Sequence, residues 1–460
     1  MALTPQPAAV RRAAVAGAFY PGEAGPLAAE VTELLEGVEC FEPRFGLPKA
    51  LIVPHAGYIY SGPVAARAYD ELALARGVVK RVVLLGPVHR VPVRGLALPA
   101  SEAFETPLGR IALDRAAAHA LEGLAQVVRS EPAHAQEHAL EVQLPFLQRM
   151  LGEFALVPLA VGDATIAEVA QVLERLWGGE ETLIVISTDL SHYHAYEEAR
   201  RIDGATLERI ARFATDLRHE EACGATPLNG FLDLARRKGL RIRMLAACNS
   251  GDTAGGKGQV VGYSSFALYE ARTIEIEQAG AALVGIARAA IENALGLGAR
   301  SEIRKLACLD QLGATFVTLT LHGRLRGCIG SLAAVLPLGE DVAANACAAA
   351  FEDPRFTKLT REEWPQCEVE VSLLSSPKPI RFADEADLLG QIRAGEDGLI
   401  LELGDKRATY LPQVWEGLPD KRQFLAELVK KAGLPADTRL ARCRVQRYRA
   451  RKFRGRALVA

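Results

Sequence analysis

Short apolar runs alternate with amphipathic segments over the first 270 residues. Six runs predict strands: Ala50–Pro54, Arg81–Gly86, Phe154–Val161, Thr182–Ser187, Arg241–Ala247 and Gln259–Leu268. Amphipathic segments between them predict helices: Pro63–Ala75, Gln136–Leu151, Thr165–Leu176, Tyr196–Phe213 and Pro227–Lys238. Strands that are apolar throughout and separated by helices indicate an α/β fold, a mainly parallel sheet sandwiched by helices. Ligands of such folds bind at the carboxyl ends of the strands.

The pattern changes between Glu270 and Gly280, where a charged stretch precedes an Ala-rich helix. We therefore place a domain boundary there, with domains at residues 1–273 and 274–460. The second part has fewer helices between its strands, which is typical of a compact α+β domain. Its predicted elements are a helix at Leu338–Phe351 and strands at Thr315–Leu321, Glu368–Leu374 and Leu399–Leu403.

Composition excludes several classes of protein. The chain has 460 residues, 49% of them hydrophobic and 24% charged, enough for two or three domains with their own cores. The formal net charge of -2 gives no overall basic field for nucleic acid and no acidic tail. The longest uncharged stretch, Ala50–Ala66, contains two prolines and two glycines, so we expect no membrane association.

Cysteine usage indicates a reducing compartment. The eight cysteines are scattered singly, without a CxxC pair, which argues against a disulfide framework and a zinc ribbon. Arg11 and Arg12 precede a short apolar run that imitates a twin-arginine export signal, but this run stops at Tyr20-Pro21. We therefore expect a cytoplasmic protein.

Histidine is concentrated in the first half: eight of the nine lie before residue 220. His55 and His89 each follow a predicted strand, and a third strand ends in Asp189 and His192. Parallel strands bring such ends into one crevice, where imidazoles ligate a metal or move protons. One such histidine alone fits a hydrogen-bonded loop residue better, but three strand ends with the same character favour function.

Cys223 is a fourth candidate for this crevice. Thr226 and Pro227 fit the N-cap and first position of a helix, which places Cys223 just before a helix N-terminus. The helix dipole would favour a thiolate there, both a nucleophile and a soft metal ligand. The alternative is a buried packing residue.

The segment from His134 to His138 matches H-x-x-E-H, the pattern of inverted zinc peptidases. Pro132 lies just upstream, so His134 falls in the loop before the helix. We assign His138 and Glu141 to the crevice of His55 instead, with a zinc peptidase as the alternative.

Residues 251–258 fit G-x-x-x-x-G-K of a phosphate loop but carry glycine where Ser or Thr must bind magnesium. A strand follows instead of a helix, so a strand connection is the better interpretation.

Seven ordered runs within residues 10–270 resemble the Memo family, also called AmmeMemoRadiSam system protein B. They are Ala-Val-Ala-Gly-Ala-Phe19-Tyr-Pro, Pro-His55-Ala-Gly-Tyr58, Gly-Pro-Val-His89, Glu137-His138-Ala-Leu-Glu141-Val-Gln-Leu-Pro-Phe, Ser-Thr-Asp189-Leu-Ser-His192, Cys223-Gly and Asn-Ser-Gly-Asp-Thr. Memo proteins resemble class III extradiol dioxygenases, which are non-haem iron enzymes.

The resemblance implies a mononuclear metal site of His55, His89 and Cys223. Iron or copper is expected, with zinc as a further candidate, because a thiolate shifts preference toward copper(I) or zinc. His192 is the expected general acid or base beside Asp189. The predicted site also includes His138 and Glu141 as catalytic residues, and Phe19 and Tyr58 as substrate-binding residues.

The second domain resembles the AMMECR domain, AmmeMemoRadiSam system protein A, over about residues 278–456. The runs that carry this resemblance are Leu-Arg326-Gly-Cys328-Ile-Gly330, Asp353-Pro-Arg355-Phe356 and Tyr410-Leu-Pro-Gln413-Val-Trp415. Arg326, Cys328 and Arg355 are candidate substrate-binding residues. The alternative is a tight glycine turn beside a small buried cysteine.

The C-terminal tail from Arg439 to Arg456 is rich in arginine. RNA binding is one interpretation. The alternation around Val445 favours the other, an edge strand guarded by charge.

Two functional hypotheses follow. The first is a two-domain, dioxygenase-like metalloenzyme that acts on a small molecule or a macromolecule together with a radical S-adenosylmethionine protein. This chain has no CxxxCxxC run, so that partner is a separate protein. The second is a non-catalytic module that binds a peptide or partner in the same cleft.

Overall fold

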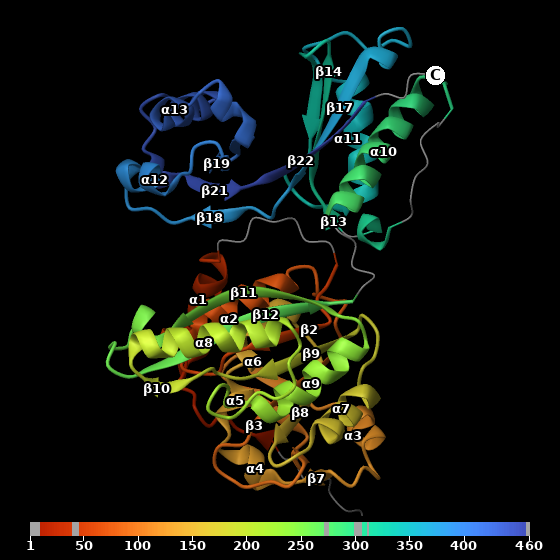
Figure 1. Ribbon diagram of the computed structural model, residues 1–460. Coiled ribbons are helices and arrows are strands. Elements are labelled where there is room, and N and C mark those ends of the chain that lie inside the picture. Colours follow the sequence, from red (N-terminus) through yellow and green to blue (C-terminus); the bar gives the residue numbers. More distant parts are fainter. Residues whose placement is uncertain (1–9, 39–45, 271–275, 299–305, 311, 457–460) are drawn as a thin grey trace, which may run out of the picture. The chain divides into compact units, whose positions relative to one another are not determined.

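The computed structural model describes residues 10–38, 46–270, 276–298, 306–310 and 312–456. The chain divides into two compact units (Figure 1). The first runs from β1 (Val10–Arg11) to β12 (Val260–Tyr269), and the second from α10 (Ile276–Ala294) to β22 (Ala450–Arg456). The predicted boundary between residues 273 and 274 lies outside the described residues.

A nine-stranded mixed sheet organises the first unit. Its four central strands are parallel and buried, as the apolar runs predict. In order across the sheet they are β2 (Ala50–Val53), β9 (Thr182–Ser187), β3 (Arg81–Pro87) and β8 (Ala155–Val161).

The margins of this sheet are antiparallel. β12 pairs antiparallel with β2, with β11 (Arg241–Asn249) and with β10 (His192–His194). On the other side, β4 (Leu96–Leu98) is antiparallel to β8 and parallel to β7 (Val127–Arg129). The two last predicted strands thus form a hairpin, because the loop of residues 250–259 is too short for a crossover helix.

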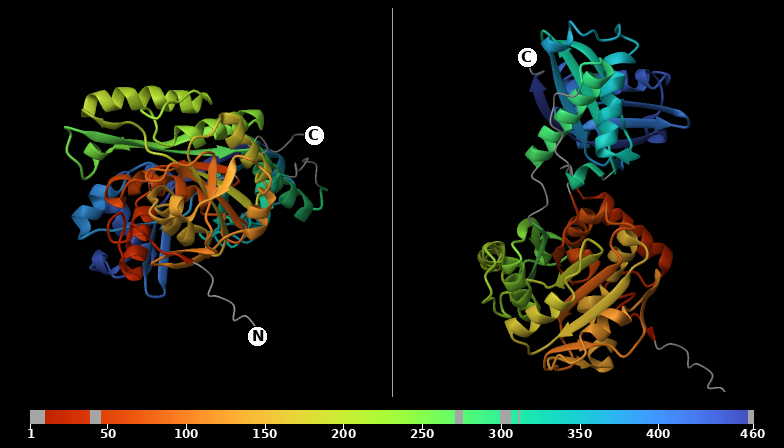
Figure 2. Two further views of the ribbon diagram at one scale, coloured as in Figure 1. Left: turned by 90° about the horizontal axis from the view of Figure 1, so that it is seen from below. Right: turned by 90° about the vertical axis from the view of Figure 1, so that its right-hand side faces the viewer.

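Helices cover both faces of the sheet (Figures 1 and 2). One face carries α7 (Ile166–Arg175), α8 (Tyr196–Ala211) and α9 (Ala225–Arg237), and the other α1 (Ala24–Glu36), α2 (Tyr58–Tyr69) and α6 (Leu144–Leu151). Ile52, Val83 and Ile186 of the sheet share a buried core with Phe231 of α9. The remaining elements of this unit are β5 (Ala103–Thr106), β6 (Gly109–Ala112), α3 (Arg115–Ala120), α4 (Glu131–Ala135) and α5 (His138–Glu141).

Two predicted helices have different boundaries. α2 begins at Tyr58, before Pro63, because the backbone N–H of Tyr58 donates to Phe19 O at 2.8 Å and sets the start of the helix. The predicted helix at 136–151 is divided into α5 and α6, since Pro145 lies in the first turn of α6. α7 follows its prediction, with a capping box between Thr165 and Glu168.

The second unit contains two antiparallel four-stranded sheets. The first has the order β15 (Arg324–Gly330), β14 (Thr315–Leu321), β17 (Cys367–Leu374) and β22, and packs against α10 and α11 (Leu338–Phe351). The second has the order β18 (Lys378–Ile380), β21 (Arg444–Tyr448), β19 (Gly398–Leu403) and β20 (Lys406–Tyr410). It packs against α12 (Glu385–Gln391) and α13 (Lys421–Lys431). A short pair, β13 (Leu312–Gly313) and β16 (Leu336–Pro337), completes this α+β unit.

The arginine-rich tail contributes to both sheets. β22 is an edge strand, and its Arg454 Nε donates to Glu370 Oε2 on β17 at 2.6 Å. Val445, by contrast, lies in β21, which has a neighbour on either side. The edge-strand interpretation is therefore right for β22 and wrong for the strand that contains Val445. RNA binding by the tail stays a prediction.

Within the described ranges, no helix has both the length and the apolar character needed to cross a membrane.

Candidate metal centre

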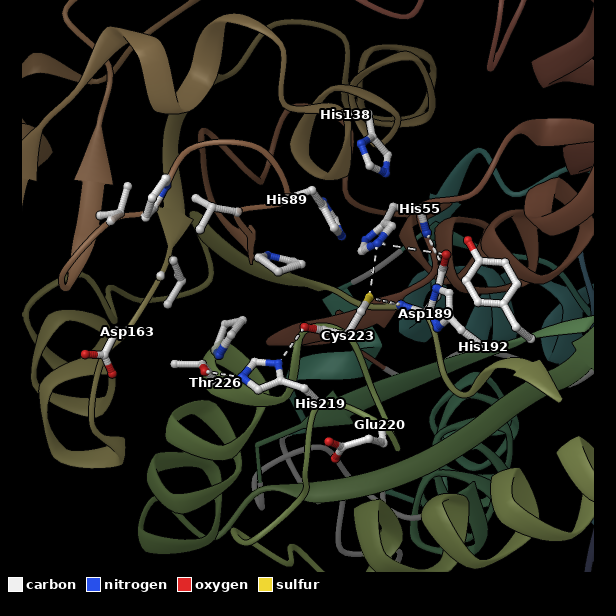
Figure 3. A pocket seen from close by; sticks show the side chains of 18 of the residues that line it. His55, His89, His138, Asp163, Asp189, His192, His219, Glu220, Cys223 and Thr226 are labelled. Atoms are coloured by element: carbon white, nitrogen blue, oxygen red, sulfur yellow. Dashed lines mark hydrogen bonds and ion pairs between the residues drawn. The ribbon is translucent and has the colours of Figure 1, made fainter.

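A cleft of about 930 Å³ opens at the carboxyl ends of the central strands (Figure 3). His55, His89 and Asp189 each lie two residues beyond the last residue of β2, β3 and β9. The cleft also takes in His138 from α5 and Cys223 from the segment before α9. Figure 3 shows these side chains turned toward one another. The parallel strands thus bring the predicted strand-end residues together.

His55 is held in one tautomer by Ser187. Its Nδ1 lies 2.9 Å from Ser187 Oγ, and that hydroxyl donates its only proton to Ala139 O at 2.7 Å. Gln143 Nε2 donates to Ser187 Oγ at 2.9 Å. Because the Ser187 proton is already donated to Ala139 O, Ser187 Oγ accepts the hydrogen bond from His55 Nδ1–H. The unprotonated Nε2 of His55 is therefore the atom that can bind a metal.

His89 is oriented in the same way by Glu137. The two carboxylate oxygens accept the backbone N–H of His89 at 2.7 Å and its Nδ1–H at 2.9 Å. Burial alone would raise the pKa of Glu137, but the hydrogen bond and charge of His89 lower it to about 2. An ionised carboxylate cannot donate, so the free lone pair of His89 is at Nε2.

His138 completes a cluster of three imidazoles. Its ring stacks on His89 at a centroid distance of 4.6 Å and meets the edge of His55 at 5.4 Å. Within the described part of the chain, His55, His89 and His138 form the group whose ligand atoms all lie within 4.8 Å of one another. Burial and then the neighbouring imidazoles lower the pKa of His138 to about 4, and the same causes lower that of His55 to about 3. Three imidazoles this close together are a fitting donor set for a transition metal.

Cys223 lies beside this cluster, next to His55. Its Sγ is 3.2 Å from His55 Nε2 and accepts the backbone N–H of Asp189 at 3.3 Å. The N-cap of α9 is Gly224, and Thr226 lies inside the first turn, so the predicted cap is wrong. Burial, followed by the charge of Asp189, raises the pKa of Cys223 to about 12. The thiol is thus protonated without a metal, contrary to the predicted helix-dipole effect, and donates to His55 Nε2.

Asp189 and His192 also line the cleft, with Asp189 next to His55. Asp189 Oδ1 accepts the backbone N–H of His55 at 2.7 Å, and Oδ2 lies 3.9 Å from His55 Nε2. Burial raises the pKa of Asp189. His192 Nδ1 donates to Leu190 O at 2.9 Å, which leaves Nε2 as the acceptor. Both predicted proton-transfer residues therefore line the cleft.

Three other predicted residues lie outside the residues that line the cleft. Glu141 is buried and its carboxylate is shared by Arg11, by Tyr20 Oη at 2.5 Å and by the backbone N–H of Val15 at 3.0 Å. The Tyr58 hydroxyl is also buried and donates to Val142 O at 2.8 Å. Phe19 is half-buried, and its ring centroid lies 5.0 Å from that of His138, so Phe19 packs against a member of the cluster.

The H-x-x-E-H segment does not form a peptidase site. His134 lies in α4 and His138 begins α5, so the two are not on one helical face. The His134 ring is buried, and its Nε2 donates to Ala97 O at 2.8 Å. Two members of this motif belong to the metal centre: His138 is the third imidazole of the cluster, and Glu137 holds His89. The prediction gave catalytic roles to His138 and Glu141 and none to Glu137. Ser187 and Gln143 lie within two of the runs that resemble the Memo family, but no role was predicted for either.

The three residues predicted for the second unit, Arg326, Cys328 and Arg355, do not form one group. Arg326 is buried and holds Glu363 Oε2 at 3.0 Å and Thr357 O at 2.8 Å. Cys328 and Arg355 are in contact, with Arg355 Nη2 donating to Cys328 O at 3.1 Å.

Fold and site together define a two-unit α/β protein with a histidine cluster that can hold a metal ion at the strand ends. A family model described as Memo-like protein matches residues 11–267, and one described as AMMECR1 matches residues 284–453. The chain therefore belongs to the Memo-like family and also carries an AMMECR1 domain.

Relatives in several organisms share the first unit. A MEMO1 family protein of Aquifex aeolicus is 37% identical over 268 residues, which are 55% of this chain and 97% of that protein. One of Aeropyrum pernix is 37% identical over 286 residues, 55% of this chain and 98% of its own. The crystal structure of uncharacterized protein PH0010 from Pyrococcus horikoshii is 36% identical, covers 39% of this chain and 92% of its own, and has a TM-score of 0.36.

Proposed function

We propose that the first unit is a metal-dependent oxidoreductase, related to class III extradiol dioxygenases, that uses a single iron or copper ion. The observation that carries this proposal is the convergence of His55, His89 and His138, with ligand atoms within 4.8 Å of one another. Membership of the Memo-like family supports it. Zinc fits the same donors and is distinguished by metal analysis.

Each side chain has a role in this proposal. His55 and His89 bind the metal through Nε2, because their Nδ1–H groups are committed to Ser187 and Glu137. His138 and the thiol of Cys223 are the candidates for the third position. A metal bound by both Cys223 Sγ and His55 Nε2 would take the place of the proton between them, 3.2 Å apart. When bound, such an ion would supply redox chemistry.

Proton transfer falls to His192, with the help of Asp189. His192 presents Nε2 to the cleft, and its tautomer is set by Leu190 O. Asp189 accepts the backbone N–H of His55 and so fixes the position of that residue. We infer that His192 moves a proton to or from the substrate while Asp189 orients His55.

The wider setting is also a proposal. The scattered cysteines favour a reducing compartment, the cytoplasm. We propose a small molecule or a peptide as substrate and a separate radical S-adenosylmethionine protein as partner. Fusion of the two units in one chain raises the effective concentration of the product of one site at the other.

Metal analysis of anaerobically purified protein tests the core of the proposal. We expect close to one iron or copper per chain in the wild type, and a loss of most of it in His55→Ala and His89→Ala. His119→Ala is the matched control, because His119 is on the exposed face of α3. His138→Ala and Cys223→Ser then rank the two candidates for the third position. If no iron, copper or zinc co-purifies and none binds with micromolar affinity, the cleft is a binding module for a peptide or partner and the enzyme proposal is wrong.

A further inference from the structure

Tyr193 lines the histidine cleft and has a backbone conformation that is uncommon for residues other than glycine. Its φ is 62°, in the left-handed region. Tyr193 is the middle residue of β10, where the pairing with β12 is irregular. His192 lies opposite Val261, and His194 lies opposite the adjacent Val260. Tyr193 is thus the extra residue of a β-bulge, a feature that changes the direction of a side chain beside an active site.

The bulge leaves the Tyr193 ring exposed to solvent. Tyr193 is 70% exposed, the highest value for a large hydrophobic side chain in the described part of the first unit. The edge of its ring meets that of His192 at a centroid distance of 5.7 Å. Left-handed backbone in residues other than glycine is concentrated at ligand-binding sites, where it places a side chain for contact with the ligand. The ring is therefore available to a ligand in the cleft.

The charge of the cleft indicates which ligand fits. Among the described residues that line it, the carboxylates are Asp163, Asp189 and Glu220, and none is Lys or Arg. Asp163 and Glu220 are exposed, and Figure 3 shows them apart from the clustered imidazoles. Arg94 lies 4.0 Å from Asp163 but pairs with Glu168 at 2.7 Å. The outer part of the cleft thus has excess negative charge, which a metal ion on the imidazoles leaves in place.

The exposed ring and the excess negative charge favour the same kind of ligand. The face of a tyrosine ring attracts an ammonium or guanidinium group through the quadrupole of the ring. Carboxylates attract the same cation over a longer range. A phosphate or carboxylate group would meet no cationic side chain among the described lining residues. The cleft therefore discriminates against anions.

We propose that the histidine cleft binds a molecule with a positively charged ammonium or guanidinium group, and that Tyr193 determines this specificity. The cation lies on the face of the Tyr193 ring, and Asp163 and Glu220 draw it into the cleft. Under the proposed function this molecule is the substrate, so the inference rests on that function for its catalytic meaning. Its test measures binding alone and can fail independently of the metal.

Binding of three small probes to the full chain tests this specificity. Benzyltrimethylammonium is the cationic probe, and its nitrogen has no lone pair for a metal. Benzenesulfonate is the anionic probe and benzyl alcohol the neutral one. Titrations followed by ligand-observed NMR give the dissociation constants, with the protein as purified and after treatment with a chelator. We expect the cation to bind about tenfold more tightly than the anion in both samples, with a smaller difference in 1 M salt.

Variants of Tyr193 show whether its ring binds the cation. Tyr193→Leu should weaken binding of benzyltrimethylammonium about two- to fivefold, whereas Tyr193→Phe keeps a ring and should bind it like the wild type. Tyr60→Leu is the matched control, since Tyr60 is 37% exposed and lies outside the residues that line the cleft. Tyr193→Gly should also weaken binding, without lowering the thermal midpoint, because glycine adopts this φ without strain. The glycine variant thus separates loss of the ring from misfolding.

Two competitors distinguish the source of the cation. Displacement of the probe by butylamine indicates a small molecule, and displacement by a blocked Gly-Lys-Gly tripeptide alone indicates a peptide. Equal affinities for the cation and the anion, or unchanged binding in Tyr193→Leu, would overturn the inference. Metal content of the same samples tests the proposed function separately. A chain that binds no metal but prefers the cation refutes the metalloenzyme and supports the cation site.

Discussion

Glu137 accepts two hydrogen bonds from His89, one from the backbone N–H at 2.7 Å and one from Nδ1–H at 2.9 Å. A carboxylate can accept both hydrogen bonds, whereas an amide can accept with one atom only, because its nitrogen is a donor. Glu137 therefore sets both the position and the tautomer of His89.

Glu137→Gln should weaken metal binding by about 10–100-fold, the usual effect of losing such an outer partner of a metal-bound histidine. The substitution preserves the size of the side chain, so the loss of affinity would come from the amide N–H group, a donor that replaces one of the two acceptors of His89. Competition with a fluorescent chelator measures the affinity. Glu220→Gln, on the exposed side of the same cleft, is the control and should bind metal like the wild type. Equal affinities of the two variants would show that Glu137 does not orient His89.

Ser187→Ala should reduce both stability and metal affinity. The change removes the acceptor of His55 Nδ1–H and leaves Gln143 Nε2 without one of its buried partners. Unsatisfied buried groups of this kind cost about 1–3 kcal/mol, measurable by urea unfolding. Ser265→Ala is a matched control, since the Ser265 hydroxyl is buried and has no hydrogen-bond partner in the described structure. An equal loss of stability in both variants would contradict the proposed role of the Ser187 hydroxyl.

The sequence predicted the metal centre as far as backbone topology determines it. His55, His89 and Asp189 occur directly after buried strands, and parallel pairing of β2, β9 and β3 is enough to bring them together. The order of motifs along the chain could not show that His138 stacks on His89 while Cys223 contacts His55 and the backbone of Asp189. These contacts depend on side-chain direction, which follows from the division of one predicted helix into α5 and α6.

The same limit explains the misplaced carboxylate. Glu137 and Glu141 are one helical turn apart in sequence, and both are buried. Their roles differ because Glu137 is the N-cap of α5 and binds His89, whereas Glu141 binds Arg11 of the N-terminal segment. Periodicity alone cannot tell which side of so short a helix faces a ligand. The antiparallel pairing of β11 and β12 is a similar case, since apolar composition does not encode strand direction.

Asp353 should make the second unit sensitive to acid. A hydrogen bond from Arg355 is the main cause that holds the pKa of Asp353 well below its usual range. The resulting stabilisation is fully present above about pH 4, the pKa of an unfolded aspartate, and is lost as the pH falls through the folded value. Asp353→Asn should therefore be less stable than the wild type at pH 7, with a difference that shrinks at pH 3. Urea unfolding at both pH values measures it, with the exposed Asp405→Asn as control. A constant difference at the two pH values would show that ionisation of Asp353 does not stabilise the unit.

Glu141→Ala should destabilise the N-terminal segment that carries Arg11, without acting on the metal directly. The side chains of Glu141 and Arg11 are 0% and 2% exposed, so the variant leaves an uncompensated buried cation and several unpaired donors. Loss of one partner of a buried pair costs about 3–5 kcal/mol, and thermal unfolding should show a correspondingly large drop in midpoint. The exposed pair of Arg110 and Glu105 provides the comparison, and Glu105→Ala should change stability by less than about 1 kcal/mol. At a temperature where Glu141→Ala is still folded, its metal content per chain should match that of the wild type. Loss of metal from the folded variant would instead support the predicted catalytic role of Glu141.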